Sequence, residues 1–236
     1  MLLFQQGGME MDAAALSKTP LFRGSTPEEV EAMLDCLGAW RRTYDKGGQI
    51  YRAGDVVTAL GIVLSGQVII ERDDFWGNTT VLDSVGPGEI FAETYACTPG
   101  EPLMVNAVAA QGTQVLFLEI ERVLRLCPSA CRHHSGLLRN LLALFSQKNL
   151  NLSRKIFHTT PKTIRGRLLS YLSEQAIRSS SCCICLPFNR QQLADYLNVD
   201  RSALSNELGK MAQDGLIRVE KNRFWLLEGQ LPAERG

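Results

Sequence analysis

Four polar side chains between residues 201 and 206 are chemically suited to read the edges of DNA base pairs. Arginine favours guanine, asparagine favours adenine, and serine can contact bases or phosphates. The four are Arg201, Ser202, Ser205 and Asn206. They fall on the first turns of a segment whose Leu204, Leu208 and Met211 recur at helical spacing. The pattern predicts a helix that buries one face and presents these four side chains to solvent.

A second predicted helix comes immediately before this one. Asn189 can cap the first helix and Asp200 the second, with only two residues between the first helix and the second cap. Such a short junction makes two helices cross steeply, as in a helix-turn-helix that places its second helix in the major groove. Arg190 and Gln191, at the start of the first helix, are predicted to face phosphates.

The residues after Gly215 alternate between apolar and polar side chains on both sides of Lys221-Asn222. Alternation of this kind predicts a β-hairpin, or wing. Its basic tip supplies Lys221 and Arg223 as further candidate DNA contacts. The alternative is an ordinary helical hairpin whose exposed polar residues bind nothing. The two caps, the basic exposed face and the wing favour DNA binding.

The chain has 236 residues and a formal net charge of +0, but its basic residues gather toward the C-terminal end. Residues 1–127 carry 9 Lys/Arg against 17 Asp/Glu, residues 128–160 carry 5 against none, and residues 161–228 carry 10 against 7. This partition favours a phosphate-binding module joined to an acidic one. We find no membrane span and no secretory signal, and the 7 cysteines suit reduced thiols, so a cytoplasmic protein is expected.

The segment from Asp45 to Glu119 consists of short apolar runs separated by glycines. Several short strands with turn residues at this spacing predict an antiparallel β-roll, and hence an α+β fold for the whole chain. A helix from about Pro27 to Leu37, capped by Thr26, is expected before the roll. The first histidine is His133, outside the roll, so a histidine-ligated metal enzyme is not expected there.

Residues 128–158 are predicted to form one long helix. Six residues follow steps of 4, 3, 4, 3 and 4, which is the seam of a two-stranded coiled coil, so a homodimer is expected. They are Leu138, Leu142, Phe145, Asn149, Leu152 and Ile156. Leu137, Leu141 and Leu144 form a second stripe, predicted to pack on the roll. The alternative is a monomeric helix buried on both stripes. His158, at the helix end, is expected to be solvated.

The order of these elements resembles the cyclic-AMP receptor/fumarate-nitrate regulator (CRP/FNR) family. The resemblance covers residues 15–228 and is carried by Arg190-Gln191, Leu193 to Ser205, and Gly88-Glu-Ile-Phe-Ala-Glu93. It implies an effector-sensing β-roll domain (1–127), a dimerisation helix (128–160) and a winged helix-turn-helix domain (161–236). It also implies a homodimeric, non-enzymatic regulator that binds a palindromic operator in duplex DNA and acts on RNA polymerase.

Two departures from the family bear on its ligands. In members that bind cyclic AMP, an Arg-Ser pair after the glutamate matching Glu93 holds the phosphate, whereas an ungapped alignment places Leu103 and Met104 there. A buried phosphate without its cation costs several kcal/mol. We therefore expect a different small effector, of unknown identity and apolar or weakly polar, with Glu93, Phe145 and Ser146 as further contacts. Asn206 replaces the usual arginine and predicts adenine where the family reads guanine.

Two groups of cysteines could carry chemistry of their own. Cys127 and Cys131, with His134 and Cys97, could hold a metal, a haem or a redox-active thiol pair, which defines an alternative metal- or redox-sensing regulator. Small packing residues are the favoured interpretation. A second group comprises Cys182, Cys183 and Cys185, which fall on a predicted strand and are interpreted as structural. A further alternative is a helix-turn-helix that has become a protein-binding fold.

Overall fold

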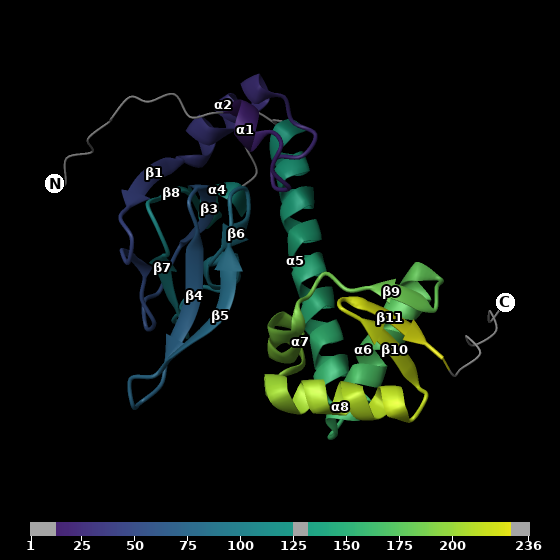
Figure 1. Cartoon of the computed structure of the whole chain (residues 1–236). Coiled ribbons are helices and arrows are strands. Elements are labelled where there is room, and N and C mark those ends of the chain that lie inside the picture. The colour runs from purple at the N-terminus through teal and green to yellow at the C-terminus, as the bar shows by residue number, and fades with distance from the viewer. Residues whose placement is uncertain (1–12, 125–131, 228–236) are drawn as a thin grey trace. The chain divides into compact units, whose positions relative to one another are not determined.

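The computed structural model describes residues 13–124 and 132–227 (Figure 1). The chain divides into two compact units, residues 1–145 and 146–236, and the boundary falls within the long helix α5 (Arg132–Thr159). Cys127 and Cys131 lie outside the described residues. None of the helices in the described segments is long and apolar enough to cross a membrane.

The first unit contains two four-stranded sheets with antiparallel pairing throughout. One sheet has the order β1 (Trp40–Tyr44), β8 (Thr113–Glu119), β3 (Ala59–Ser65), β6 (Ile90–Phe91). The other has the order β2 (Gln49–Tyr51), β7 (Asn106–Ala109), β4 (Val68–Asp73), β5 (Thr79–Val85). This arrangement confirms the predicted antiparallel roll and the α+β fold class.

Four short helices accompany the roll. They are α1 (Ala13–Leu16), α2 (Pro27–Leu37), α3 (Glu93–Ala96) and α4 (Ile120–Leu124). The Thr26 hydroxyl accepts the Glu29 N–H at 3.3 Å, and the Glu29 carboxylate accepts the Thr26 N–H at 3.0 Å. This reciprocal capping box fixes the start of α2, as the sequence predicts.

The second unit contains three further helices and a small sheet. The helices are α6 (Ile164–Ser179), α7 (Arg190–Leu197) and α8 (Arg201–Gln213). The sheet has the order β10 (Ile217–Glu220), β11 (Arg223–Leu226), β9 (Cys183–Cys185), all antiparallel. Leucines from all three helices pack with Ile217 of β10 and Phe224 of β11 in one core. The winged helix-turn-helix is therefore present as predicted.

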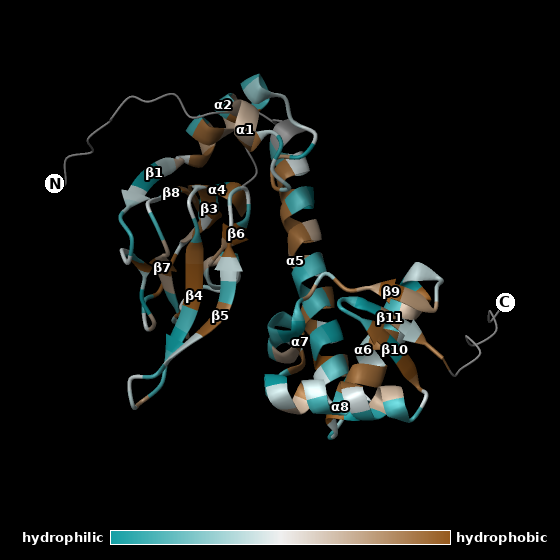
Figure 2. Cartoon of the chain, in the orientation of Figure 1, coloured by the Kyte–Doolittle hydropathy of each residue, from teal (hydrophilic) through white to brown (hydrophobic). Residues whose placement is uncertain are grey.

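Helix α5 carries one buried and one exposed apolar stripe. Leu137 and Leu141 are 1% and 3% exposed and pack in the core of the first unit. On the predicted seam, Leu142, Leu152 and Ile156 are 68%, 63% and 63% exposed in the single chain. Figure 2 shows hydrophobic and hydrophilic residues alternating along the helix. The helix is therefore not buried on both stripes. Its seam is exposed at Leu142, Asn149, Leu152 and Ile156, whereas Leu138 and Phe145 are half-buried against the core of the first unit.

Candidate functional site

The turn between α7 and α8 sets the geometry of the site. Asn198 ends α7 in the left-handed conformation (φ 53°), and its N–H donates to the Asp195 carbonyl at 3.2 Å. Two residues later, the Asp200 carboxylate accepts the Ala203 N–H at 2.9 Å and starts α8. The hydrogen bond from Ser202 is the largest of the effects that lower the pKa of Asp200, so the cap stays charged. These contacts end one helix and begin the next within three residues.

Helix α8 separates its apolar and polar side chains as predicted. Leu204 and Met211 are fully buried, whereas the four candidate base-reading residues are all exposed; these are Arg201, Ser202, Ser205 and Asn206. The Ser205 hydroxyl donates to the Arg201 carbonyl at 3.0 Å, and the Ser202 hydroxyl donates to Asp200. The serines thus keep acceptor lone pairs free, and no side chain in the described part of the chain occupies the donors of the Arg201 guanidinium or the Asn206 amide.

The two polar residues at the start of α7 differ in their surroundings. The guanidinium of Arg190 lies 5.0 Å from the centroid of the Phe224 ring, and burial lowers its pKa. Gln191 is exposed, and its amide donates to Asp195 at 2.8 Å. Arg190 therefore helps to pack α7 on the wing strand β11, a role the sequence pattern does not indicate.

The wing places its cations at an exposed tip. Lys221 has a left-handed backbone (φ 54°), which closes the turn between β10 and β11. Lys221 and Arg223 are both exposed. Behind them, Arg218 lies 5.2 Å from the ring centroid of Trp225 and is paired with Glu220. The tip residues are thus presented on a short, supported hairpin.

Two arginines of α6 hold the helix-turn-helix in place, and the sequence analysis missed both. Arg167 donates to the carbonyls of Leu197 and Asn198 at 3.1 and 2.9 Å, which satisfies the C-terminal end of α7. Arg165 pairs with Glu207 at 2.6 Å and with Asp214 at 2.7 Å, both at α8 or its end. The sequence pattern did not predict α6, and the partners of both arginines lie elsewhere in the chain, so only tertiary packing reveals this function.

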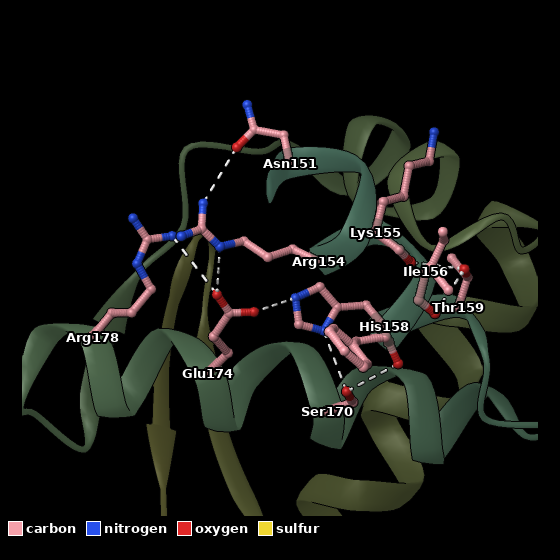
Figure 3. A network of polar contacts seen from close by, with 10 residues as sticks. Asn151, Arg154, Lys155, Ile156, His158, Thr159, Ser170, Glu174 and Arg178 are labelled. Atoms are coloured by element: carbon pink, nitrogen blue, oxygen red, sulfur yellow. Dashed lines mark hydrogen bonds and ion pairs between the residues drawn. The ribbon is translucent and has the colours of Figure 1, made fainter. Parts of the chain in front are cut away.

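A polar network joins the C-terminal end of α5 to α6. The His158 Nε2–H donates to Glu174 at 2.6 Å, and its Nδ1 shares a hydrogen bond with the Ser170 hydroxyl at 3.2 Å. Glu174 also accepts from Arg154 at 3.3 Å and lies 3.9 Å from Arg178, as Figure 3 shows. His158 is 2% exposed, so the prediction of a solvated histidine was wrong.

Aromatic rings surround the same histidine. Its ring is perpendicular to that of Tyr171 at 5.3 Å and lies 6.0 Å from that of Tyr196, with Phe188 5.3 Å from Tyr196. Burial raises the pKa of Tyr171 to about 12. These contacts fix the last turn of α5 on the core that carries α7 and α8.

The candidate effector residues have mixed environments. Glu93 and Leu103 are buried, 4% and 5% exposed, whereas Met104 is 65% exposed. The Met104 N–H donates to the Tyr95 hydroxyl at 3.4 Å, which places this backbone beside α3. Phe145 packs partly on the core of the first unit, and Ser146, the first residue of the second unit, is exposed. Tyr95 is a neighbour that the sequence analysis missed.

The candidate metal and redox residues are only partly described. Burial, followed by the charge of Glu93, raises the pKa of Cys97, which disfavours the thiolate that binds metals. His134 is 7% exposed, and none of the residues that the structure describes is a hydrogen-bond partner of its ring nitrogens. Within residues 13–124 and 132–227, no group of three or more His, Cys, Asp or Glu side chains could hold a metal ion.

Two family models match the chain. The cyclic nucleotide-binding domain matches residues 41–129, and the Crp-like helix-turn-helix domain matches residues 166–229. The first match covers the roll and the second covers the winged helix-turn-helix. Fold and matches together define a transcription regulator with a DNA-binding helix-turn-helix.

Similar proteins are regulators of the same kind. The chain is 30% identical over 220 residues, 92% of this chain and 96% of the other, to the cyclic AMP receptor protein of Thermus thermophilus. It is 21% identical to a CRP-like cAMP-activated global transcriptional regulator of Mycobacterium tuberculosis, over 93% of this chain and 97% of the other. The chain belongs to the CRP/FNR family.

Solved structures agree on the fold. One of CprK in complex with OCPA has a TM-score of 0.60 at 14% identity, over 85% of this chain and 92% of the other. The c-di-GMP responsive regulator CLP of Xanthomonas campestris has a TM-score of 0.53 at 21% identity, over 86% of this chain and all of the other (100%). At these identities the likeness concerns the fold alone.

Proposed function

We propose that this chain is a homodimeric, sequence-specific DNA-binding regulator that inserts α8 into the major groove and acts on RNA polymerase. The observation that carries the proposal is the polarity of α8: Leu204 and Met211 are buried beneath it, and Arg201 and Asn206 project from its exposed first turns. Arg201 would read guanine and Asn206 adenine, with Ser202 and Ser205 as acceptors. Arg190, Gln191, Lys221 and Arg223 would contact phosphates.

Salt dependence tests DNA binding directly. Affinity for duplex DNA is measured by fluorescence anisotropy at several salt concentrations. Neutralised phosphates release counterions, so log K should fall linearly with log salt, with a slope of about −0.9 for each phosphate contact. A flat dependence, or no binding in the presence of cell extract metabolites, would favour the alternative of a protein-binding fold.

The exposed seam of α5 supports the homodimer. One stripe of this helix carries three apolar side chains that are each more than 60% exposed. They are Leu142, Leu152 and Ile156. A second copy of the same stripe would bury them, with Asn149 as the polar residue that sets the register. Two recognition helices would then meet half-sites about one helical turn apart on a palindromic operator.

A charged residue on the seam should break the dimer. The proposed change is Leu152→Asp, and the matched control is Leu150→Asp, which is exposed (51%) but lies one residue past a seam position. Analytical ultracentrifugation should report a monomer for the first variant and a dimer for the second. A dimeric Leu152→Asp protein would contradict this interface.

The effector is proposed to bind in the roll near Glu93, with Leu103, Met104, Phe145 and Ser146 as further contacts. Several relatives are named for cyclic AMP. In this chain, Leu103 and Met104 occupy the positions expected for the phosphate-binding pair, and neither carries a charge to pair with a cyclic phosphate. A less polar small molecule would therefore be preferred.

Calorimetric titration with cyclic AMP tests that preference. The expected result is no saturable heat at millimolar ligand, and binding should be gained by a Leu103→Arg/Met104→Ser variant. Micromolar binding of cyclic AMP to the unaltered chain would show that it is a cyclic-nucleotide-controlled regulator instead.

Control by metal or thiol chemistry would require Cys127 and Cys131, so Cys127→Ser and Cys131→Ser variants that keep their response would exclude that alternative.

A further inference from the structure

Three cysteines within four residues lie at the edge of the wing sheet. Cys182, Cys183 and Cys185 are all exposed, so packing in a core does not explain them. Strand β9 is the edge strand of the order β10-β11-β9, and Figure 1 shows it beside β11. Within β9, Ile184 is buried and the cysteines on either side of it point to solvent. The wing therefore carries a strip of accessible thiols.

Cys185 differs from its neighbour Cys183 through its contacts with the wing tip. Its cross-strand partner is Arg223, whereas that of Cys183 is Trp225. The side-chain amide of Asn222, in the wing turn, donates to the Cys185 sulfur at 3.4 Å and to the Leu186 carbonyl at 3.2 Å. Cys185 thus contacts the turn that presents Lys221 and Arg223.

We propose that Cys185 is a modification site at which low-molecular-weight disulfides form a mixed disulfide and weaken DNA binding. The proposal rests on the proposed DNA-binding function of the wing. The Cys185 thiol gives its proton to solvent, and the thiolate attacks one sulfur of the small disulfide. The disulfide bond breaks, a bond to Cys185 Sγ forms, and the other half leaves as a thiolate. The electrons balance without any further oxidant.

The strand geometry keeps the adduct from being resolved by Cys183. Alternate residues of a strand have Cα atoms about 6.6 Å apart and parallel Cβ directions, whereas a disulfide needs a Cβ–Cβ distance of about 3.5–4.5 Å. Cys183 therefore does not close an internal disulfide while β9 stays paired to β11. The mixed disulfide persists until a thiol reductant removes it.

The adduct acts on DNA binding in two ways. It displaces the hydrogen bond from Asn222 and so loosens the wing turn. A glutathione adduct also adds two carboxylates and one ammonium group, a net charge of about −1, opposite Arg223, where an incoming phosphate would be repelled. The loosened turn and the added negative charge both weaken contacts between the wing and the phosphate backbone. The base-reading residues of α8 are not altered.

The experiment treats the full-length reduced protein with oxidised glutathione, maps adducts by peptide mass spectrometry, and measures DNA affinity against salt before and after treatment. We expect the adduct mainly on Cys185, about tenfold weaker binding, a salt slope reduced by about 1, and recovery with dithiothreitol. Cys185→Ser should bind DNA like the untreated protein and ignore glutathione. Cys183→Ser, altered on the same face of the same strand, should respond like the unaltered chain.

Two results would overturn the proposal: adducts on Cys182 or Cys183 as abundant as on Cys185, or a Cys185 adduct that leaves affinity and salt slope unchanged. Failure of the untreated protein to bind DNA would instead contradict the proposed function. The masses of the adducts report the preference for Cys185 without any DNA measurement. Failure of the modification proposal can therefore be told apart from failure of the proposed DNA binding.

Discussion

Charged side chains on α8 and on α6 lie in opposite environments. Arg201 on α8 is exposed, and the described part of the chain offers it no ion pair. Arg165 on α6 is held by Glu207 and Asp214, and Glu174 is shared by Arg154 and His158. Paired groups have already exchanged water for protein partners, so they set the position of the helices. Unpaired groups keep their donors for a ligand. We therefore expect substitutions of the paired residues to lower the stability of the fold, and substitution of Arg201 to lower the affinity for DNA.

The largest effect on stability is expected at His158. His158→Ala removes a buried ring that contacts Tyr171, Tyr196 and Glu174, and large-to-small changes of this kind cost about 3 kcal/mol. Denaturant unfolding followed by circular dichroism measures the loss. Arg178→Ala is the matched control, because its ion pair with Glu174 is long and its side chain is 56% exposed. A loss of less than about 0.5 kcal/mol is expected for the control. Equal losses of stability in the two variants would contradict the claim that the buried His158, and not the exposed Arg178, holds this network.

The converse is expected at Arg201. Arg201→Ala should weaken operator binding by about 1–3 kcal/mol, or roughly fivefold to 150-fold, because a bidentate contact to guanine is lost. Its melting temperature should equal that of the unaltered protein, since the side chain is exposed and supports no helix contact. Anisotropy titration and a thermal melt on the same sample check both halves. A drop in melting temperature with unchanged affinity would show that Arg201 supports the fold and does not contact DNA.

Arg165 is expected to give a smaller effect of the opposite kind. Arg165→Ala removes two ion pairs to α8 and its end, but the arginine side chain is 36% exposed, so solvent screening keeps the loss of stability small. Operator affinity per folded molecule should stay within about twofold of the unaltered value. Calorimetric unfolding combined with active-fraction titration separates these quantities. A large loss of affinity in fully folded protein would show that Arg165 contacts DNA.

The smallest effect is expected at Asp200, on melting temperature at low pH. Like Arg201 its side chain is exposed, but like Arg165 it has partners, here within its own turn. Its folded pKa is lowered, mainly by the Ser202 hydrogen bond, so its stabilisation is present above the ordinary aspartate pKa and is lost as pH falls through the folded value. Asp200→Asn keeps a good cap without titrating. Melting temperatures of the two proteins should agree at neutral pH, and the variant should lose less on acidification below pH about 4. Parallel acid sensitivity would show that Asp200 contributes nothing there.

The parts of the fold that the sequence predicted are those fixed by local rules. Asn189, Asp200 and Thr26 cap helices because their side chains bond backbone N–H groups two or three residues away. Strand β1 was missed because Arg41 and Arg42 interrupt its apolar pattern, and it forms through pairing with β8, about 70 residues later in the chain. Helical periodicity likewise separated the buried Leu137 and Leu141 from the exposed seam.

The supporting contacts of the site escaped prediction for a related reason. Glu174 and Arg167 look like solvated helix residues, but His158 on α5 and Leu197 on α7, which they contact, lie on other helices. His158 was expected to be solvated because it ends a helix, yet α6 and the aromatic rings cover it. The candidate DNA contacts were accessible to prediction because they depend only on which face of α8 is buried. The effector site depends on packing between distant segments, and its contacts remain a proposal.

Selection of bound sequences from random duplex DNA, performed in parallel with the unaltered protein and with Arg201→Ala and Asn206→Arg variants, tests the central claim most directly. We expect a palindrome with half-sites about one helical turn apart, loss of preference at a single guanine in each half-site for Arg201→Ala, and an adenine-to-guanine change at one step for Asn206→Arg. Identical selected sequences from all three proteins would contradict the claim that the exposed turns of α8 read DNA.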